Sequence, residues 1–490
     1  MAPKFHREEG SMSTTRTCTS VAAAFLLLVT AQSAVSLDNG LARTPPMGWA
    51  SWNAFLWMID EAKITGNADA MVSTGLRDAG YEYMLVDLGW QAYAAGAMRA
   101  RFPDSTIKHD AGKFPNGMQY LADYIRSKGL RYAAYTDVGY ETCGDMTEGS
   151  REFEYKDMAT FAGWGADYVK IDWCGADGRD ARSVYSLFKN AIEATGRPMV
   201  FSLCCWGQQN VHTWGNEVGN LWRISGDIEA TWESVMSIVD RAMSWNLVNY
   251  HGPGGWNDLD MLQVGNGDLT LDENRAHFSL WCMFASPLMV GTDLRSVSDD
   301  IVAILTNPEV IAVNQDSLGL MCRKVAGGAE QQVFAKLMQD SSYAVLLLNR
   351  GTASATMTAN WEDVGLQSGD QALVRDLWER ADKGMHTGSY SAEVPSHGVV
   401  MLEVTRADLV KTVQSSDRSG HRSLAPALRG LDASPGDRIS VVDLRGAVVR
   451  SLSAGRNLSA LRSDLAPGSY LVVKQAPDGA TVLRRLRVAH

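Results

Sequence analysis

Short apolar runs that end on an aspartate recur along the first part of the chain. In the run Tyr168–Cys174, Val169 and Ile171 indicate a buried strand, which ends on polar and aromatic residues. Burying Lys170 beside Asp172 is costly unless the two charges are paired or used. We therefore interpret Asp172 as a catalytic carboxylate, with capping of the next helix as the alternative. The other runs of this form are Tyr83–Asp87, Tyr132–Asp137, Leu221–Asp227 and Gly254–Asp260.

Helical patterns separate these strands. In Met118–Gly129 and Val184–Gly196, apolar residues recur three or four positions apart until a glycine ends the pattern. Further apolar runs bring the number of candidate strands to eight: Met47–Asn53, Pro198–Gly207 and Phe284–Asp293. Eight alternating strands and helices across residues 37–325 predict an α/β fold, a (β/α)8 TIM barrel. The active site of such a barrel lies at the C-terminal strand ends, where the aspartates converge.

Beyond the barrel the pattern changes to alternating strands with Gly, Ser and Asn turns. Residues 326–404 are predicted to form an antiparallel β-sandwich, with strands at Val333–Leu337, Tyr343–Leu348, Ala372–Trp378 and Val399–Val404. Residues 405–425 are polar and broken, which predicts a linker. Residues 426–490 are predicted to form a small β-sandwich tail, with strands at Ile439–Leu444, Ala447–Leu452, Ser469–Val473 and Thr481–Val488.

Charge and aromatic content set the tail apart. The whole chain has a formal net charge of -11, which argues against a nucleic-acid partner. Residues 406–490 hold 14 Lys/Arg against 7 Asp/Glu, so the tail carries +7 and the remainder -18. The tail resembles the C-terminal sorting domain of some bacterial exported proteins, which would make the export machinery a partner. A carbohydrate-binding module is the alternative, but all 15 Trp lie before residue 405, and sugars usually stack on aromatic rings.

The N-terminus has the pattern of a secretion signal. Val21–Thr30 is an apolar run that follows the basic Arg16, and small residues near position 36 allow cleavage. This run is too short to span a membrane, and no later run is longer and equally apolar. We therefore expect residues 1–36 to be a signal peptide and the protein to be secreted or held at the cell surface, with no membrane span.

Four motifs resemble those of the α-galactosidase family, glycoside hydrolase family 27. They are Met-Gly-Trp-Ala-Ser-Trp-Asn (47–53), Lys-Ile-Asp-Trp-Cys (170–174), Trp-Arg-Ile-Ser-Gly-Asp-Ile (222–228) and Gly-Pro-Gly-Gly-Trp-Asn-Asp-Leu-Asp-Met (252–261). The resemblance covers roughly residues 40–404, and the motifs occur in the family's order. It implies a retaining exo-glycosidase, a barrel followed by a β-sandwich, a carbohydrate substrate and no cofactor. It also implies a disulfide between Cys143 and Cys174, and we expect the other cysteines of the mature chain to be small buried residues.

Retaining hydrolysis needs two carboxyl groups about 5 Å apart, one to attack the sugar and one to donate a proton. By match to the family, Asp172 is the nucleophile and Asp227 the acid/base. The matched sugar-binding residues are Trp49, Asp87, Tyr135, Lys170, Cys205, Trp206, Arg223 and Met261. Asp258 and Asp260 are expected to orient Arg223 or Asp227. No histidines or cysteines occur with metal-ligand spacing, so no metal site is predicted.

Two departures from the family pattern affect the choice of sugar. The family's Asp-Asp-Cys-Trp, whose carboxylates hold the 4- and 6-hydroxyls of galactose, is Asp87-Leu88-Gly89-Trp90 here. The family's Cys-Glu-Trp is Cys204-Cys205-Trp206 here, and the smaller Cys205 could admit a bulkier 2-substituent. Terminal α-D-galactosides remain the first choice. β-L-arabinopyranosides and α-N-acetylgalactosaminides are the alternatives, and a non-catalytic glycan-binding protein or a metal-dependent hydrolase represents the other classes.

Overall fold

The computed structural model describes residues 37, 39–93, 100–144 and 147–409, together with four strands between 438 and 488. The predicted signal peptide lies outside the described residues, as does the predicted linker from residue 410 onward. Within the described part of the chain, no helix combines the length and the apolar character needed to cross a bilayer.

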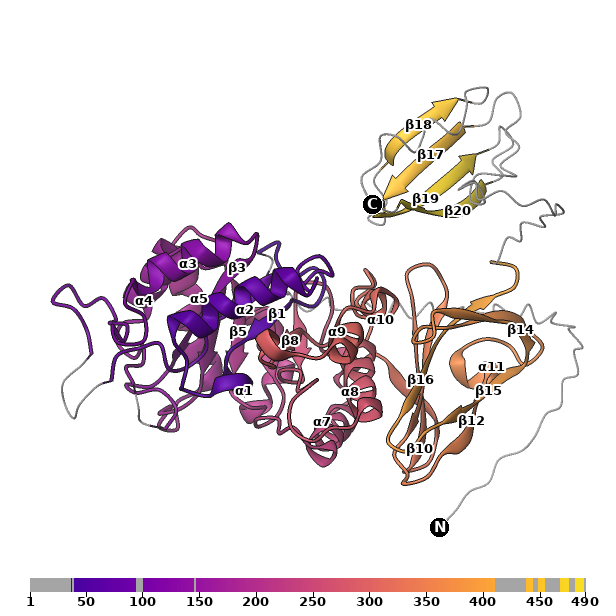
Figure 1. Ribbon diagram of the computed structural model, residues 1–490, viewed down its shortest axis with the longest axis horizontal. Helices are drawn as coiled ribbons and strands as arrows, with labels where there is room; N and C mark the ends of the chain where they lie inside the picture. The colour runs from indigo at the N-terminus through magenta and orange to yellow at the C-terminus, as the bar shows by residue number, and fades with distance from the viewer. Residues whose placement is uncertain are drawn as a thin grey trace, which may run out of the picture. The chain divides into compact units, whose positions relative to one another are not determined.

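Eight parallel strands form the predicted barrel (Figure 1). They are β1 (Met47–Ala50), β2 (Tyr83–Leu85), β3 (Arg131–Asp137), β4 (Tyr168–Asp172), β5 (Val200–Cys204), β6 (Leu221–Arg223), β7 (Trp256–Asp258) and β8 (Leu288–Val290). Their order in the sheet runs from β7 down to β1 and then β8. A parallel bridge between Leu262, just after β7, and Val290 of β8 joins the two ends. Each of the eight predicted strands is present, although most are shorter than predicted.

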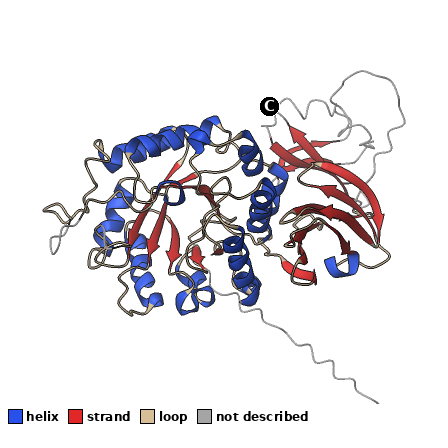
Figure 2. Cartoon of the chain, turned by 60° about the horizontal axis from the view of Figure 1, so that its bottom comes forward, coloured by secondary structure: helices blue, strands red, loops and turns tan. Residues whose placement is uncertain are grey.

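Helices surround the strands (Figure 2). They are α1 (Trp52–Phe55), α2 (Glu61–Ser73), α3 (Gly117–Ser127), α4 (Glu154–Gly163), α5 (Ala181–Ala194), α6 (Gly215–Val218), α7 (Trp232–Ser244), α8 (Leu271–Met283), α9 (Asp299–Leu305) and α10 (Pro308–Asn314), with short 3-10 turns at Gln208–Thr213, Leu247–Asn249 and Leu294–Ser296. Side-chain caps fix where several of them start. Asp60, Asp180 and Thr231 each accept a backbone hydrogen bond from the first turn of α2, α5 and α7. Thr270 and Glu273 form a capping box on α8.

Two sets of apolar side chains pack on opposite faces of the barrel strands. Residues between the strands and the helices, such as Val169 and Ile171, belong to the large outer core. Tyr168 of the same strand belongs to a smaller cluster that fills the barrel interior. Because successive strand residues point to opposite faces, Lys170 and Asp172 share the inward face with Tyr168. This alternation decides which residues reach the site.

The β-sandwich follows the barrel as predicted. Its strands are β9 (Arg323–Gly327), β10 (Gln331–Leu337), β11 (Tyr343–Asn349), β12 (Ala355–Asn360), β13 (Gln371–Asp376), β14 (Ala381–Thr387), β15 (Ser389–Val394) and β16 (Val399–Arg406), with a short helix α11 (Trp361–Val364). The six-stranded sheet has the order β14-β13-β16-β11-β10-β9, and β12 pairs with β15. Strands such as β14 were not predicted because they have no buried residue.

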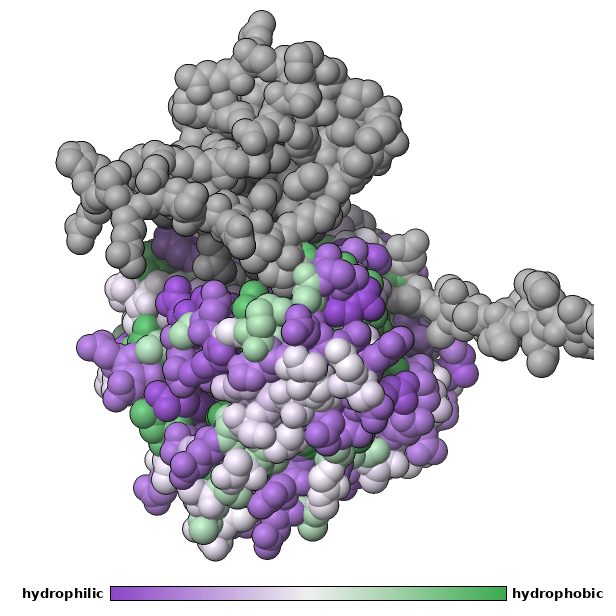
Figure 3. All heavy atoms as spheres, turned by 90° about the vertical axis from the view of Figure 1, so that its right-hand side faces the viewer, coloured by the Kyte–Doolittle hydropathy of each residue, from purple (hydrophilic) through white to green (hydrophobic). Residues whose placement is uncertain are grey.

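On the face shown in Figure 3, hydrophilic residues predominate over scattered hydrophobic ones.

Polar side chains of the sandwich satisfy helix ends of the barrel. Lys336 of β10 is buried and donates hydrogen bonds to the carbonyl oxygens of Cys282 (3.2 Å) and Val313 (2.8 Å), near the ends of α8 and α10. Burial lowers the pKa of Lys336 to about 8. Arg375 of β13 forms a bidentate pair with Glu309 of α10, with both bonds at 2.8 Å. The sandwich therefore stabilises the helices that close the barrel.

The tail contains the four predicted strands, β17 (Arg438–Asp443), β18 (Val448–Ser453), β19 (Gly468–Gln475) and β20 (Thr481–Val488). They form an antiparallel sheet in the order β18-β17-β19-β20. In the described part of the chain, these strands pair only with one another.

The self-contained pairing of the tail predicts the effect of a truncation. Deleting residues 421–490 should leave turnover and the melting temperature of the remaining chain unchanged, because no barrel or sandwich strand loses a partner. Steady-state kinetics and calorimetry on the purified proteins would measure this. A large fall in turnover would show that the tail contributes to the active site.

Candidate active site

Asp172 lies at the inner C-terminal end of β4. Its side chain is about one-tenth exposed and lies 4.0 Å from Lys170 Nζ, measured at Oδ2. The Tyr135 hydroxyl donates to Oδ2 (3.3 Å), and the Trp173 N–H donates to Oδ1 (3.1 Å). Burial raises the pKa of Asp172, with Asp87 and Asp227 adding to it and Lys170 and Arg223 opposing it.

Lys170 connects Asp172 to the end of β2. Its Nζ donates to Asp87 Oδ2 (2.9 Å), and both side chains are buried. Although burial alone would lower the pKa of Lys170, the carboxylates of Asp87 and Asp172 help to raise it well above its usual value. Leu88 is buried in the interior cluster and donates its N–H to Asp87 Oδ1 (2.8 Å). The wall beside Asp87 is therefore apolar.

Arg223 at the end of β6 makes a second ion-pair group. Its Nη2 lies 2.6 Å from Asp260 Oδ2, a buried carboxylate, and 3.1 Å from Oδ1 of Asp227, whose side chain is 68% exposed. Burial alone would raise the pKa of Asp227, but Arg223 and Lys170 outweigh it and hold this pKa below its usual value. Burial raises the pKa of Asp260 to about 6 and also raises that of Asp258.

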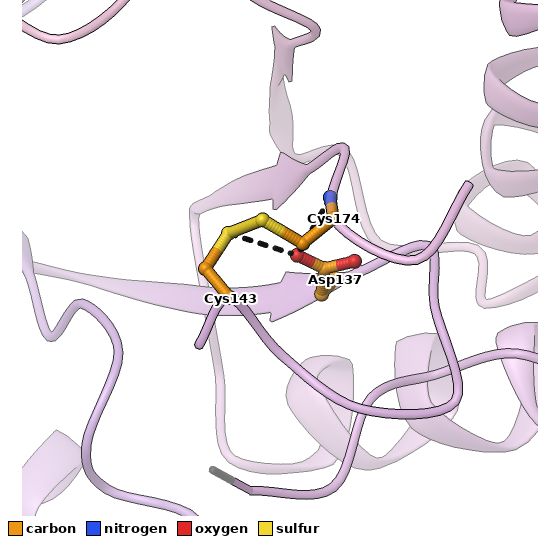
Figure 4. A group of neighbouring side chains, drawn as sticks. All are labelled: Asp137, Cys143 and Cys174. Atoms are coloured by element: carbon orange, nitrogen blue, oxygen red, sulfur yellow. Dashed lines mark hydrogen bonds between the residues drawn. A yellow bond between two sulfur atoms is a disulfide. The ribbon is translucent and has the colours of Figure 1, made fainter. Parts of the chain in front are cut away.

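The predicted disulfide is present. Cys143 and Cys174 are bonded, with their Cα atoms 5.1 Å apart, and so join the loops that follow β3 and β4. Asp137 lies beneath this bond and accepts a hydrogen bond from the Cys174 N–H (3.2 Å), as Figure 4 shows. These three residues are the one group in the described residues with metal-ligand proximity. Because a zinc-type ligand is a free thiolate and both sulfurs are bonded to each other, we assign no metal there.

The structure places two of the predicted sugar-binding residues, Trp49 and Cys205, in the outer core rather than in the barrel interior. Trp49 is fully buried in the outer core, and its Nε1 donates to the Thr292 carbonyl (2.8 Å), so it cannot line the interior. Trp52 is partly exposed and packs against the interior cluster. Trp52, rather than Trp49, therefore lies against the interior cluster.

Cys205 likewise points away from the interior. Its side chain has no exposed surface and belongs to the outer core, where burial raises its pKa to about 12. Cys204 is instead the register partner of Asp172 and accepts a hydrogen bond from Arg223 Nη1 at 3.8 Å. The register decides the facing, since Ser202 pairs with Lys170 and Cys204 with Asp172 two residues later, and a strand buried on both faces does not display this in its sequence.

The remaining predicted residues lie at or near the C-terminal ends of the barrel strands, and their roles stay predictions. Tyr135 and Met261 are buried in the interior cluster. Trp206 is partly exposed and has a left-handed φ of 54°, which turns the chain out of β5. Asp258 accepts a hydrogen bond from the Asp260 N–H (2.9 Å) and so supports the carboxylate that holds Arg223. The free cysteines 204, 205, 282 and 322 are all buried, as expected.

A barrel whose C-terminal strand ends carry one buried and one exposed carboxylate, each near a cation, has the groups that a glycoside hydrolase needs. Comparison with known proteins gives the family. The model for α-galactosidase A matches residues 44–316, and that for the α-galactosidase C-terminal β-sandwich domain matches residues 328–404. The chain belongs to the α-galactosidase family, glycoside hydrolase family 27.

Individual relatives agree with this assignment. An α-galactosidase of Cyamopsis tetragonoloba is 44% identical over 368 residues, which cover 75% of this chain and 88% of that protein. The crystal structure of α-galactosidase I from Mortierella vinacea is similar with a TM-score of 0.72 at 35% identity, covering 75% of this chain and 98% of that one. A family 27 β-L-arabinopyranosidase from Geobacillus stearothermophilus gives a TM-score of 0.66 at 25% identity, covering 75% and 97%.

The opposite pKa shifts of Asp260 and Asp227 predict opposite pH dependences of stability. A carboxyl whose pKa is raised from 3.8 to about 6 by folding stabilises the fold below pH 4, and this contribution is lost as the pH rises through 6. We expect the unfolding free energy of the wild type, relative to Asp260→Asn, to fall by about 2 kcal/mol between pH 4 and 7. Relative to Asp227→Asn it should instead rise over the acidic range, since the pKa of Asp227 is lowered. Denaturant titrations across this range would measure both differences, and parallel pH profiles for the two variants would contradict the assignment.

Proposed function

We propose that the protein is a retaining exo-glycosidase that removes terminal α-D-galactosyl residues, with Asp172 as nucleophile and Asp227 as acid/base. The observation that carries the proposal is the contrast between these carboxylates. Asp172 is buried beside Lys170 at the end of β4, whereas Asp227 is exposed and held by Arg223. A nucleophile must lie against the sugar in the barrel, and an acid/base must reach the leaving group and water at its mouth.

The ion pairs support the first step. The positive charges of Lys170 and Arg223 favour the ionised form of Asp172, whose carboxylate attacks the anomeric carbon. The bond to the leaving oxygen breaks as Asp227 gives that oxygen its proton. In the free protein Asp227 is exposed and its pKa is low, so a bound aglycone that excludes water would raise its pKa and favour the protonated form. In the second step Asp227 takes a proton from water, which displaces Asp172 and restores the original anomeric configuration.

Replacing the two carboxylates tests these roles. With an activated aryl α-galactoside, Asp172→Asn should lower turnover by at least about a thousandfold, because no nucleophile remains. Asp227→Ala should slow hydrolysis of the glycosyl intermediate and regain activity with azide, which needs no general base. The product of the azide reaction should keep the α configuration, as measured by NMR. An inverted product would rule out double displacement.

Leu88 favours a second candidate substrate. Its buried side chain faces the interior and cannot accept a hydrogen bond from the 6-hydroxyl of galactose. β-L-Arabinopyranosides lack the C6 group, and a family 27 protein of that activity is among the similar structures. Because Cys205 points away from the interior, its small side chain does not favour the bulkier 2-substituent of α-N-acetylgalactosaminides.

A substrate panel with a matched variant separates these candidates. Aryl α-galactoside, β-L-arabinopyranoside and α-N-acetylgalactosaminide would be compared in kcat/KM for the wild type and for Leu88→Asp. Restoring a carboxylate should favour the α-galactoside over the β-L-arabinopyranoside by roughly ten- to hundredfold, the effect of one charged hydrogen bond. If the wild type hydrolyses another member of the panel at least tenfold faster than the α-galactoside, the primary substrate assignment is wrong, while the fold and mechanism stand.

We also propose that the protein is exported. The support is the apolar run Val21–Thr30 after Arg16 and the composition of the tail. N-terminal sequencing of the protein recovered outside the producing cells would test it, since the mature chain should start near residue 37.

A further inference from the structure

Asp137 is a buried carboxyl of the barrel interior that the proposed mechanism does not use. It ends β3 as the register partner of Asp172, and its side chain has no exposed surface. One oxygen accepts a hydrogen bond from the Gly139 N–H (2.8 Å), and the other accepts one from the Cys174 N–H (3.2 Å). Asp137 therefore holds the chain just beyond β3 and just beyond β4 at once (Figure 4).

The backbone held in this way also holds Asp172. The Trp173 N–H donates to Asp172 Oδ1 (3.1 Å), and Trp173 directly precedes Cys174. The Val138 N–H donates to the main-chain oxygen of Asp172 (3.1 Å), and Val138 directly precedes Gly139. Besides the Tyr135 hydroxyl, these two backbone N–H groups donate to Asp172, and each belongs to a residue next to one whose N–H is bound by Asp137.

We propose that Asp137 is a positioning residue for Asp172, acting through the backbone of Val138 and Trp173 rather than through contact with the sugar. The proposal rests on the role of Asp172 as nucleophile. It deepens that role by naming what fixes the direction of attack. A displacement of the nucleophile by about 1 Å is enough to cost a large factor in rate.

Charge does not oppose this role. Burial and the charge of Asp172 raise the pKa of Asp137 well above its usual value, which favours the neutral form of Asp137 beside the nucleophile. The titratable and charged groups that face the pair come from several elements: Asp87, Tyr135, Lys170, Arg179, Cys204, Arg223 and Asp227. A neutral carboxyl can still accept both backbone hydrogen bonds.

Asp137→Asn tests the proposal with little change of shape. The amide nitrogen cannot accept a hydrogen bond, so one of the two backbone N–H groups loses its partner. With 2,4-dinitrophenyl α-galactoside we expect kcat to fall at least tenfold and the pre-steady-state burst to slow. The Ki of galactose should stay within twofold, because Asp87, Lys170 and Arg223 are unaltered. An unchanged kcat would overturn the proposal, and so would an equal loss of kcat and galactose affinity, which indicates general damage to the site.

Asp157 provides the matched control. It is equally buried and binds Arg101 (2.7 and 2.8 Å) and Ser150 (2.7 Å), but it has no hydrogen bond to the turn after β4. Asp157→Asn should lower the melting temperature while kcat stays within about twofold. A fall in kcat as large as that of Asp137→Asn would show that loss of another buried carboxylate near the end of β3 has the same effect, and would overturn the proposal.

A second variant serves if Asp137→Asn does not fold. Replacing both Cys143 and Cys174 with serine removes the disulfide but leaves the two hydrogen bonds of Asp137. We expect kcat to stay within about threefold; a tenfold loss would assign the positioning to the disulfide instead. Asp172→Asn distinguishes failure of this inference from failure of the proposed function. If Asp172→Asn is inactive while Asp137→Asn keeps its kcat, this inference alone fails; if Asp172→Asn stays active, the proposed function fails.

Discussion

Burial of charge inside an apolar barrel is the constraint on which the site depends. Among the described residues, Lys170 and Arg223 are buried cations of the interior, and each has a buried carboxylate as a close partner, Asp87 at 2.9 Å and Asp260 at 2.6 Å. Each cation is also near one of the proposed catalytic carboxylates. The same arrangement therefore occurs twice: a buried anion fixes a cation, and the cation then acts on a reacting group. Without the buried anions, the cost of desolvation would favour neutral Lys170.

The backbone around Arg223 is strained to make this arrangement possible. Asp260 has a φ of 82°, which an L residue rarely adopts and which costs about 1–3 kcal/mol. Its backbone N–H donates to Asp258, its carboxylate accepts from Ile228 and Met261, and its carbonyl accepts from Trp281 Nε1. These hydrogen bonds hold the Asp260 carboxylate in the orientation in which it pairs with Arg223. Asp258 and Asp260 thus act as one unit, which explains why the motif contains both.

The barrel could be predicted from sequence because its signals are local. Each strand is an apolar run, and most runs end in a polar residue that marks the functional edge. The differences at the site are differences of facing rather than of motif: Trp49 and Cys205 lie in the outer core, whereas Trp52 packs against the interior cluster and Cys204 is the register partner of Asp172. Which of two adjacent residues faces inward depends on the register with neighbouring strands, and an apolar sequence that is buried on both faces does not display it. Asp137 was seen as a strand end, but its bond to Cys174 depends on a contact between two loops. Strand β14 was missed because its side chains cover no core.

Leu88 links the choice of sugar to the state of the nucleophile. A second carboxylate at this position would add a negative charge near Lys170 and so draw on the same cation that lies 4.0 Å from Asp172. With leucine at this position, Asp87 is the close partner of Lys170. The positive charge of Lys170 also acts on Asp172 and opposes the rise of its pKa. The apolar side chain also lowers the local polarity, which strengthens the charge interactions that remain. Leucine at position 88 therefore adds no negative charge that would raise the pKa of Asp172 further, so a substitution there would affect both the proposed sugar preference and the proposed nucleophile.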